Sequence, residues 1–395
     1  MALNIPQVTP NQALDAIKAL YPMRLTAQMV AMLHGSPGVG KSSVVRRAAR
    51  ELGIDLIDRR IGQMPPEDLI GLPYRDDASG VSGYMPPSWL PREGSGILFL
   101  DEFLCADSRV QNAALELLLD RRLGTYVLPD GWMVILAGND ASQGTATFSM
   151  TSAAADRTTH FHIVANASAW LDWAMQNNIH PAVMTIIKVA PHLLDGIDER
   201  VTQDNIAGTS PRGWEKVSHV LHNMPDTPLR EIVVAGIIGQ AAATDFKQIL
   251  VEIAAYAPVK EIMEVDDSAK RVKMLPRSLN GLWAMAFGLQ SEAIDLETSR
   301  RAIAVSLDIP KIELADEDGV LPLAEIQRLA HELLMAKIPH LRISREIIRT
   351  PEYKAAQAWW KAIKEAHTVT YSTETTPETG TGAAQGDSQD SLEAA

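Results

Sequence analysis

The residues with the clearest chemical meaning lie between Gly35 and Ser42, where the sequence reads Gly-Ser-Pro-Gly-Val-Gly-Lys-Ser. This run fits the pattern G-x-x-x-x-G-K-[ST], in which a glycine-rich loop turns its backbone N–H groups toward phosphate oxygens. Lys41 is placed to reach the terminal phosphates, and the Ser42 hydroxyl to bind magnesium. The residues predicted to bind the nucleotide are Gly35, Ser36, Pro37, Gly38, Val39, Gly40, Lys41, Ser42 and Ser43.

The flanks of this loop have the patterns of a strand and a helix. Residues 29–33 are apolar throughout, as in a short buried strand. After the loop, apolar residues recur with a helical period until Gly53, which can end a helix. This order places the loop at a helix N-terminus, where the dipole favours anions. A glycine-rich turn that matched by chance would lack these flanks.

Two carboxylates follow a second buried strand. Residues 97–100 are Ile-Leu-Phe-Leu and lead directly into Asp101 and Glu102. Because strands of an open parallel sheet end at the ligand crevice, Asp101 is predicted to hold Mg²⁺ beside Ser42, and Glu102 to polarise the attacking water. The alternative is a pair of solvated acids at a strand end. Cys105 has no paired histidine and is predicted to be a packing residue.

A third apolar run, residues 133–137, ends in Gly138-Asn139. An Asn at the tip of a core strand can hydrogen-bond the γ-phosphate or the attacking water. Between the second and third runs, an amphipathic helix is predicted to begin after Asp107 or Ser108 and to end at Gly124. Arg121 and its neighbour Arg122 are assigned to the negative end of that helix dipole.

These features together make the chain similar to AAA+ ATPases of the MoxR type, in the dynein-related branch of the P-loop NTPase superfamily. The chain also carries a Pro-x-Asp-Leu-x-Gly-like segment at 66–71, an inserted hairpin before Asp101, and an Asp156-Arg157 pair. The resemblance implies that Asn139 is the sensor 1 residue and that Arg157 is an arginine finger for the neighbouring subunit. Thr158 and Thr159 follow Arg157, where the family usually has Phe.

Arg212 stands in a position that local preference disfavours. Ser210 is a natural N-cap and Pro211 suits the first helical position, so Arg212 falls in the first turn, where a cation opposes the dipole. An arginine in that place suggests a ligand, and the resemblance identifies Arg212 with the sensor 2 residue that contacts nucleotide. The alternative is an ordinary surface arginine.

The predicted fold class is α/β: an AAA+ core with a five-stranded parallel sheet and helices on both faces, followed by helical regions. We assign residues 1–165 to the core, with an inserted hairpin near 72–90, 166–245 to a helical lid, 246–371 to a helical C-terminal region and 372–395 to a disordered tail. Residues 229–243 form one apolar helical stretch. The aromatic residues Tyr74, Tyr84 and Trp89 are equally open to a partner-contact or a packing interpretation. Arg59 and Arg60 follow a predicted strand at the edge of the site, and they are interpreted either as the solvated end of that strand or as residues with a switch role.

Composition narrows the function classes. The formal net charge is -13, which disfavours broad binding to nucleic acid. A single cysteine cannot form an internal disulfide, so we expect a reducing, cytoplasmic compartment. No leader segment and no apolar run of membrane-spanning length is seen, so no membrane association is expected.

The function predicted from these observations is Mg²⁺-dependent hydrolysis of ATP to ADP and phosphate. The resemblance implies a homo-oligomeric ring, a hexamer, that remodels or activates a partner protein in the manner of a chaperone. It also implies that this partner carries a von Willebrand factor A domain. Two alternatives stay open: a nucleic-acid motor, and a nucleotide-gated scaffold with little turnover. The acidic balance counts against the first, and intact Glu102, Asn139 and Arg157 count against the second.

Overall fold

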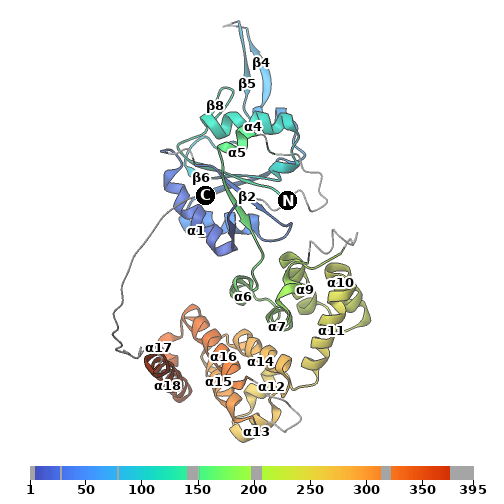
Figure 1. The fold of residues 1–395 in the computed structure, drawn as a ribbon, viewed down its shortest axis with the longest axis vertical. Helices are drawn as coiled ribbons and strands as arrows, with labels where there is room; N and C mark the ends of the chain where they lie inside the picture. Colours follow the sequence, from blue (N-terminus) through green and yellow to red (C-terminus); the bar gives the residue numbers. More distant parts are fainter. Residues whose placement is uncertain are drawn as a thin grey trace, which may run out of the picture.

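The computed structural model describes residues 5–26, 29–77, 80–139, 150, 152–196, 207–312 and 322–373. An α/β domain is formed by the first part of the chain and a helical region by the rest (Figure 1). Within the described ranges, no helix combines the length and the apolar character needed to cross a bilayer. The tail predicted at 372–395 lies outside those ranges, except for Ser372 and Thr373.

A six-stranded parallel sheet organises the α/β domain, in the order β1-β10-β2-β9-β6-β3. The strands are β1 (Gln7–Val8), β2 (Ala31–Gly35), β3 (Asp55–Arg60), β6 (Ser95–Asp101), β9 (Gly131–Ala137) and β10 (Thr159–Ile163). The five predicted strands are present, and β1 adds a sixth at the edge beside β10. Because all strands run the same way, β2, β6 and β9 end at one edge of the sheet.

Helices cover both faces of this sheet, as predicted. Alternate residues of β6 point to opposite faces, so Ile97 and Phe99 join one apolar cluster while Leu98 and Leu100 join another. The first cluster lies under α1 (Pro10–Leu20) and α2 (Lys41–Leu52), and the second under α3 (Pro66–Ile70) and α4 (Ser108–Asp120). All four side chains are fully buried. The middle of β6 is therefore fixed by packing, and only its end reaches the site.

The helix α4 begins where predicted but ends earlier. The Asp107 carboxylate caps it by accepting from the backbone N–H of Val110 at 3.1 Å. The predicted end at Gly124 is wrong: α4 ends at Asp120, and Arg121 takes the left-handed conformation with φ of 56°. Its guanidinium donates to the backbone carbonyls of Pro129 at 2.9 Å and of Trp132, in β9, at 2.8 Å, and these contacts offset the backbone cost.

Two hairpins stand on this domain. The inserted one consists of β4 (Leu72–Asp76) and β5 (Val81–Met85), paired antiparallel as the sequence predicts, and it projects from the domain (Figure 1). The other, β7 (Arg122–Leu123) with β8 (Tyr126–Val127), was not predicted, and Gly124 lies in its turn. The Thr125 hydroxyl donates to the Tyr84 carbonyl at 2.9 Å, so the two hairpins touch.

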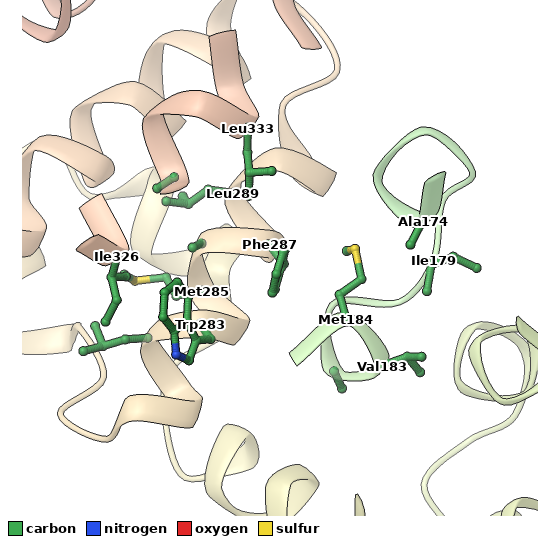
Figure 2. Packing of buried hydrophobic residues seen from close by; sticks show 14 of the residues in the cluster. Ala174, Ile179, Val183, Met184, Trp283, Met285, Phe287, Leu289, Ile326 and Leu333 are labelled. Atoms are coloured by element: carbon green, nitrogen blue, oxygen red, sulfur yellow. The ribbon is translucent and has the colours of Figure 1, made fainter. Parts of the chain in front are cut away.

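The helical region is built around one apolar core. Figure 2 shows α7, α14 and α16 meeting there through residues such as Met184, Phe287 and Leu333. Its helices are α6 (Ala167–Gln176), α7 (Pro181–Val189), α9 (Pro211–Asn223), α10 (Pro228–Ile238), α11 (Gln240–Ala254), α12 (Val259–Glu264), α13 (Ser268–Met274), α14 (Leu279–Glu292), α15 (Leu296–Asp308), α16 (Leu323–Lys337), α17 (Ser344–Ile347) and α18 (Pro351–Thr373).

The helical stretch predicted at 229–243 is two helices, not one. Gly239 has a φ of 85° and separates α10 from α11, because an L side chain rarely adopts this conformation while glycine does so freely. From there α11 runs through the boundary predicted between residues 245 and 246. Trp214 of α9 and Ala356 of α18 are buried in the same core, so the predicted lid and C-terminal region share their packing.

Candidate nucleotide site

The P-loop connects β2 to α2 at the carboxyl edge of the sheet. Gly35, Gly38 and Gly40 have φ values of 144°, 87° and 108°, in the region that glycine adopts without strain. At Gly35 a side chain is also excluded by space, because a Cβ there would lie 2.5 Å from the Ile163 carbonyl oxygen of β10. The three glycines therefore let the loop turn tightly against the sheet, as the motif requires.

Lys41 opens α2 with its side chain folded into the loop. Its ammonium donates to the backbone carbonyls of Gly35 at 2.6 Å and Ser36 at 3.1 Å. It also donates to the Asn139 side-chain oxygen at 2.8 Å. Only 7% of Lys41 is exposed, which is unusual for a lysine and reflects these three bonds. Lys41 and Asn139, nearly a hundred positions apart, thus lie together as predicted.

Ser42 and Asp101 form a second pair beside the first. The Ser42 hydroxyl donates to one carboxylate oxygen of Asp101 at 2.9 Å. The other oxygen accepts from the backbone N–H of Glu102 at 2.8 Å. The predicted adjacency of the two metal-ligand candidates is confirmed. A hydroxyl and one carboxylate fit Mg²⁺, which takes few protein ligands and fills its octahedron with phosphate oxygens and waters. Among the described residues there is no cluster of three or more His, Cys, Asp or Glu side chains of the kind that holds a metal by itself.

Glu102 follows β6 in a left-handed conformation, with φ of 60° and ψ of 29°. Non-glycine residues rarely adopt this conformation, and it turns the side chain out of the strand direction. The carboxylate lies against Gly62, where a Cβ would come within 3.2 Å of its Oε2. Nearby, burial and then the charges of Glu102 and Asp101 raise the pKa of the Cys105 thiol. A protonated thiol is a poor nucleophile, in agreement with the packing interpretation of Cys105.

The N-terminus of α9 lies against the P-loop. The Ser210 hydroxyl caps this helix by accepting from the Gly213 N–H at 3.0 Å, and Pro211 occupies its first position, both as predicted. A Cβ built on Gly38 would lie 3.3 Å from the Cβ of Arg212. The Arg212 side chain is exposed. The helical region thus brings Arg212 to the loop, 171 positions after Lys41 in sequence.

Arg157 lies away from this group of contacts. It follows the short helix α5 (Ser152–Asp156), its side chain is exposed, and its guanidinium donates to the Ala153 carbonyl at 2.8 Å. The structure therefore does not bring Arg157 into a contact with Lys41, Ser42 or Asp101 of the same chain among the bonds of the described residues. The remaining loop residues, Ser36, Pro37, Val39 and Ser43, lie between β2 and the first turn of α2.

Sequence reasoning missed two side-chain pairs at the margin of the site. His34, directly before Gly35, contacts His160 of β10, with ring nitrogens 2.9 Å apart. Arg59, near the end of β3, is exposed, as the solvated-strand-end interpretation expects, and its guanidinium lies 5.4 Å from the centre of the Trp89 ring. The available signal for the first pair was a histidine in β2 and two histidines in β10. Nothing in the sequence marked the second.

Comparison with known protein families gives a match for residues 31–158 of the chain. Residues 31–158 match the sequence model of the ATPase family associated with various cellular activities, AAA. No curated protein sequence matches the chain. The sequence match covers the P-loop, Asp101, Glu102, Asn139 and Arg157, and it ends where β10 begins.

Three solved structures resemble the fold. NtrX from Brucella abortus in complex with ADP is 15% identical, with 82% of this chain and 68% of that chain covered and a TM-score of 0.36. A RuvB point mutant from Thermotoga maritima is 15% identical, with 64% and 73% covered and a TM-score of 0.34. A candidate ATPase from Cytophaga hutchinsonii is 15% identical, with 82% and 89% covered and a TM-score of 0.32. Residues 31–158 of this chain are thus similar in sequence to the AAA ATPase domain, and the P-loop and its neighbouring side chains lie within the matched range.

Proposed function

We propose that this chain is a magnesium-dependent ATPase of the MoxR type, which uses hydrolysis to remodel or activate a partner protein. One observation carries the catalytic part of the proposal. Two independent side-chain pairs, Lys41 with Asn139 and Ser42 with Asp101, converge on the same edge of the sheet at hydrogen-bond distance. A loop that only packed against the sheet would not need a buried ammonium bonded to an asparagine from a different strand.

The roles follow from the chemistry of each group. The backbone N–H groups of residues 35–43 surround the phosphates, and Lys41 exchanges its carbonyl contacts for oxygens of the β- and γ-phosphates. Ser42 and Asp101 would hold Mg²⁺, which neutralises charge on the phosphate oxygens. Glu102 polarises the attacking water, and Asn139 orients the water or the γ-phosphate. Arg212, next to Gly38, would contact the nucleotide from the helical side.

The geometry of Arg157 supports a ring. Its guanidinium is exposed and bonded within its own turn, so it is free to be presented to a neighbouring copy. A charge that stabilises the transition state from a neighbouring subunit is an arginine finger. We therefore propose a homo-oligomeric ring, a hexamer by resemblance. The von Willebrand factor A domain of the partner rests on the resemblance alone, and the cytoplasmic location rests on the single cysteine.

The test of the catalytic assignment is Glu102→Gln. The amide cannot polarise water as a carboxylate does, whereas the pair of Ser42 and Asp101 is unchanged, so the variant is expected to bind ATP with Mg²⁺ and to lose most turnover. Glu93→Gln, an exposed acid outside the site, is the matched control and should hydrolyse ATP at the wild-type rate. Equal rates for Glu102→Gln and wild type would move the catalytic role elsewhere. The trapped variant is also the one with which to isolate a partner.

The test of the ring is a mixture of two inactive variants. Arg157→Ala keeps an intact loop but lacks the finger, and removal of a finger costs about a thousandfold or more in rate. Lys41→Ala keeps the finger but has a broken loop. Where the two meet in one ring, a complete site returns, at about a quarter of the interfaces for equal random mixing. Co-assembly without any recovery of activity would refute action between subunits.

A further inference from the structure

A pair of histidines connects the P-loop strand to the segment that carries Arg157. His34 lies on β2 and His160 on the neighbouring β10, and a nitrogen of each ring meets the other at 2.9 Å. The rings are stacked, with centres 5.2 Å apart. His34 is 6% exposed, and His160 is half-buried. The contact crosses the sheet diagonally, since the register pairs His160 with Met32 and His162 with His34.

The partners of these rings determine where their protons lie. The His160 Nε2 is 3.0 Å from the Ala155 carbonyl oxygen, which can only accept, so His160 carries a proton on Nε2 and donates it there. With that proton on Nε2, its Nδ1 is the acceptor of the pair. The His34 Nε2 faces that atom and must donate to it. The result is a directed series of bonds from His34 through His160 to Ala155.

At the His160 end, this series of hydrogen bonds reaches residues that precede and follow Arg157 in the sequence. Ala155 precedes Arg157 by two positions, and the hydroxyl of Thr158, the residue after Arg157, lies 2.9 Å from the His160 Nε2. That hydroxyl donates to the Ala154 carbonyl at 3.0 Å, the same carbonyl that accepts the backbone N–H of Arg157 at 3.3 Å. The turn that presents Arg157 is therefore held by His160 at two points. At its other end the series begins one residue before Gly35.

We propose that His34 and His160 are positioning residues that hold the Arg157 turn in place relative to the P-loop strand of the same subunit. The inference rests on the proposed role of Arg157 at a neighbouring site. A short helix of five residues has little packing of its own, and Ala154 is its buried residue. An arginine finger has to meet the transition state closely, because a misplacement of about 1 Å can cost about a hundredfold in rate.

The surroundings keep this arrangement stable near neutral pH. Burial, and then the neighbouring His160, His162 and Lys41, together lower the pKa of His34 from 6.5 to about 4. His34 therefore stays neutral at neutral pH, and its ring keeps one donor and one acceptor nitrogen. Water is excluded from the buried His34 ring, so a lost acceptor at position 160 would leave its N–H without a substitute.

The deciding experiment adds His160→Phe to one member of the mixture of Arg157→Ala and Lys41→Ala subunits. Phenylalanine keeps the stacked ring and removes both nitrogens. In the Lys41→Ala subunit, which donates the finger, we expect recovered activity to fall at least about tenfold. In the Arg157→Ala subunit, which supplies only the loop, we expect recovery equal to that of the parental mixture. Tagged subunits report whether co-assembly is the same in both mixtures.

Each result decides the matter. Equal loss in both mixtures shows a general structural defect and overturns the inference, and so does equal recovery in both. If the parental mixture itself gives no activity while subunits co-assemble, the proposed finger fails and the inference fails with it. The loop-side mixture also serves as the folding control, because it contains the same substitution.

Two further substitutions divide the series. His160→Asn offers an acceptor near the Nδ1 position and keeps the bond from His34, whereas His160→Gln offers an N–H near the Nε2 position and keeps the bond to Ala155. If the whole series of hydrogen bonds holds the Arg157 turn, both substitutions are expected to reduce the ATPase activity recovered when they are placed in the Lys41→Ala subunit. His222→Phe is the matched control, because His222 also pairs with another histidine, His180, but in the helical region. Wild-type recovery with both Asn and Gln would overturn the inference.

Discussion

Lys41→Ala removes an ammonium that the structure buries inside the P-loop. This ammonium donates to the Gly35 carbonyl at 2.6 Å, the Asn139 side-chain oxygen at 2.8 Å and the Ser36 carbonyl at 3.1 Å. A hydrogen bond to a charged group contributes about 1.5–3 kcal/mol, so contacts with both the β- and γ-phosphates would contribute about 3–6 kcal/mol. Because ATP must replace existing bonds, we expect the lower end of that range. A loss of about 3 kcal/mol raises Kd for ATP by about a hundredfold.

The measurement is a titration with a fluorescent ATP analogue, made in the Glu102→Gln background so that hydrolysis does not deplete the ligand. Arg46→Ala is the matched control: Arg46 lies on the same helix, is more than half exposed, and pairs with Asp58 at 2.8 Å. Its Kd should equal that of the background protein. If Lys41→Ala weakens ATP binding by less than about tenfold, or 1.4 kcal/mol, the proposed contact with the phosphates is refuted. Unchanged thermal unfolding of both variants would show that the difference arises in the loop.

Two other predictions concern the hairpin and the helical region. Since 43% of Tyr84 is exposed, Tyr84→Ala should leave basal ATPase activity and the unfolding temperature unchanged but weaken coupling to a partner. Trp89→Ala should lower the unfolding temperature, because Trp89 donates to the Asp68 carbonyl and lies under Arg59. The reverse pattern would assign the opposite roles to the two residues. Burial, then His222 and Arg230, lowers the pKa of His180 from 6.5 to about 4. As pH falls, His180 is therefore protonated at a lower pH in the folded state than in the unfolded state. The contribution of neutral His180 to the free energy of unfolding is fully present above pH 6.5 and is lost as pH falls toward 4, with a loss of about 1–2 kcal/mol at pH 5. His180→Asn keeps an acceptor for the Ala182 N–H, which His180 Nδ1 now accepts, and should lose less stability than wild type between pH 7 and pH 5; an equal loss in calorimetry would contradict this.

The sequence predicted those parts of the fold that depend on neighbouring residues. The P-loop, the caps at Asp107 and Ser210, and the buried strand before Asp101 each have a local cause, whether a glycine conformation, a capping oxygen or an unbroken apolar run. The position of Asn139 at the tip of a core strand was also predicted, whereas its bond to Lys41 follows from β9 being the neighbour of β2 in the sheet.

The features that were missed depend on side-chain contacts and backbone conformations rather than on a residue pattern. The end of α4 at Asp120 is set by carbonyls of Pro129 and Trp132 that hold Arg121 in a left-handed conformation, and no local pattern shows this. Gly239 divides an apolar stretch whose periodicity continues on both sides. The contact of His34 with His160 requires knowing that β2 and β10 are neighbours and how they are aligned. The exposed or buried state of Tyr84 and Trp89 required the structure for the same reason.

The packing of α9 has a mechanical consequence. Its first turn touches the P-loop at Gly38, while its Trp214 is buried in a core that extends through α14 and α16 to Ala356 of α18. Because one continuous core does not deform gradually, a tilt of α9 has to carry all of these helices with it. The helical region then acts as a lever that pivots at the contact between α9 and the P-loop. A displacement of atomic size at Gly38 would become a much larger sweep at α18, the far end of that region (Figure 1). If the chain hydrolyses ATP as proposed, the largest movement would therefore occur at α18.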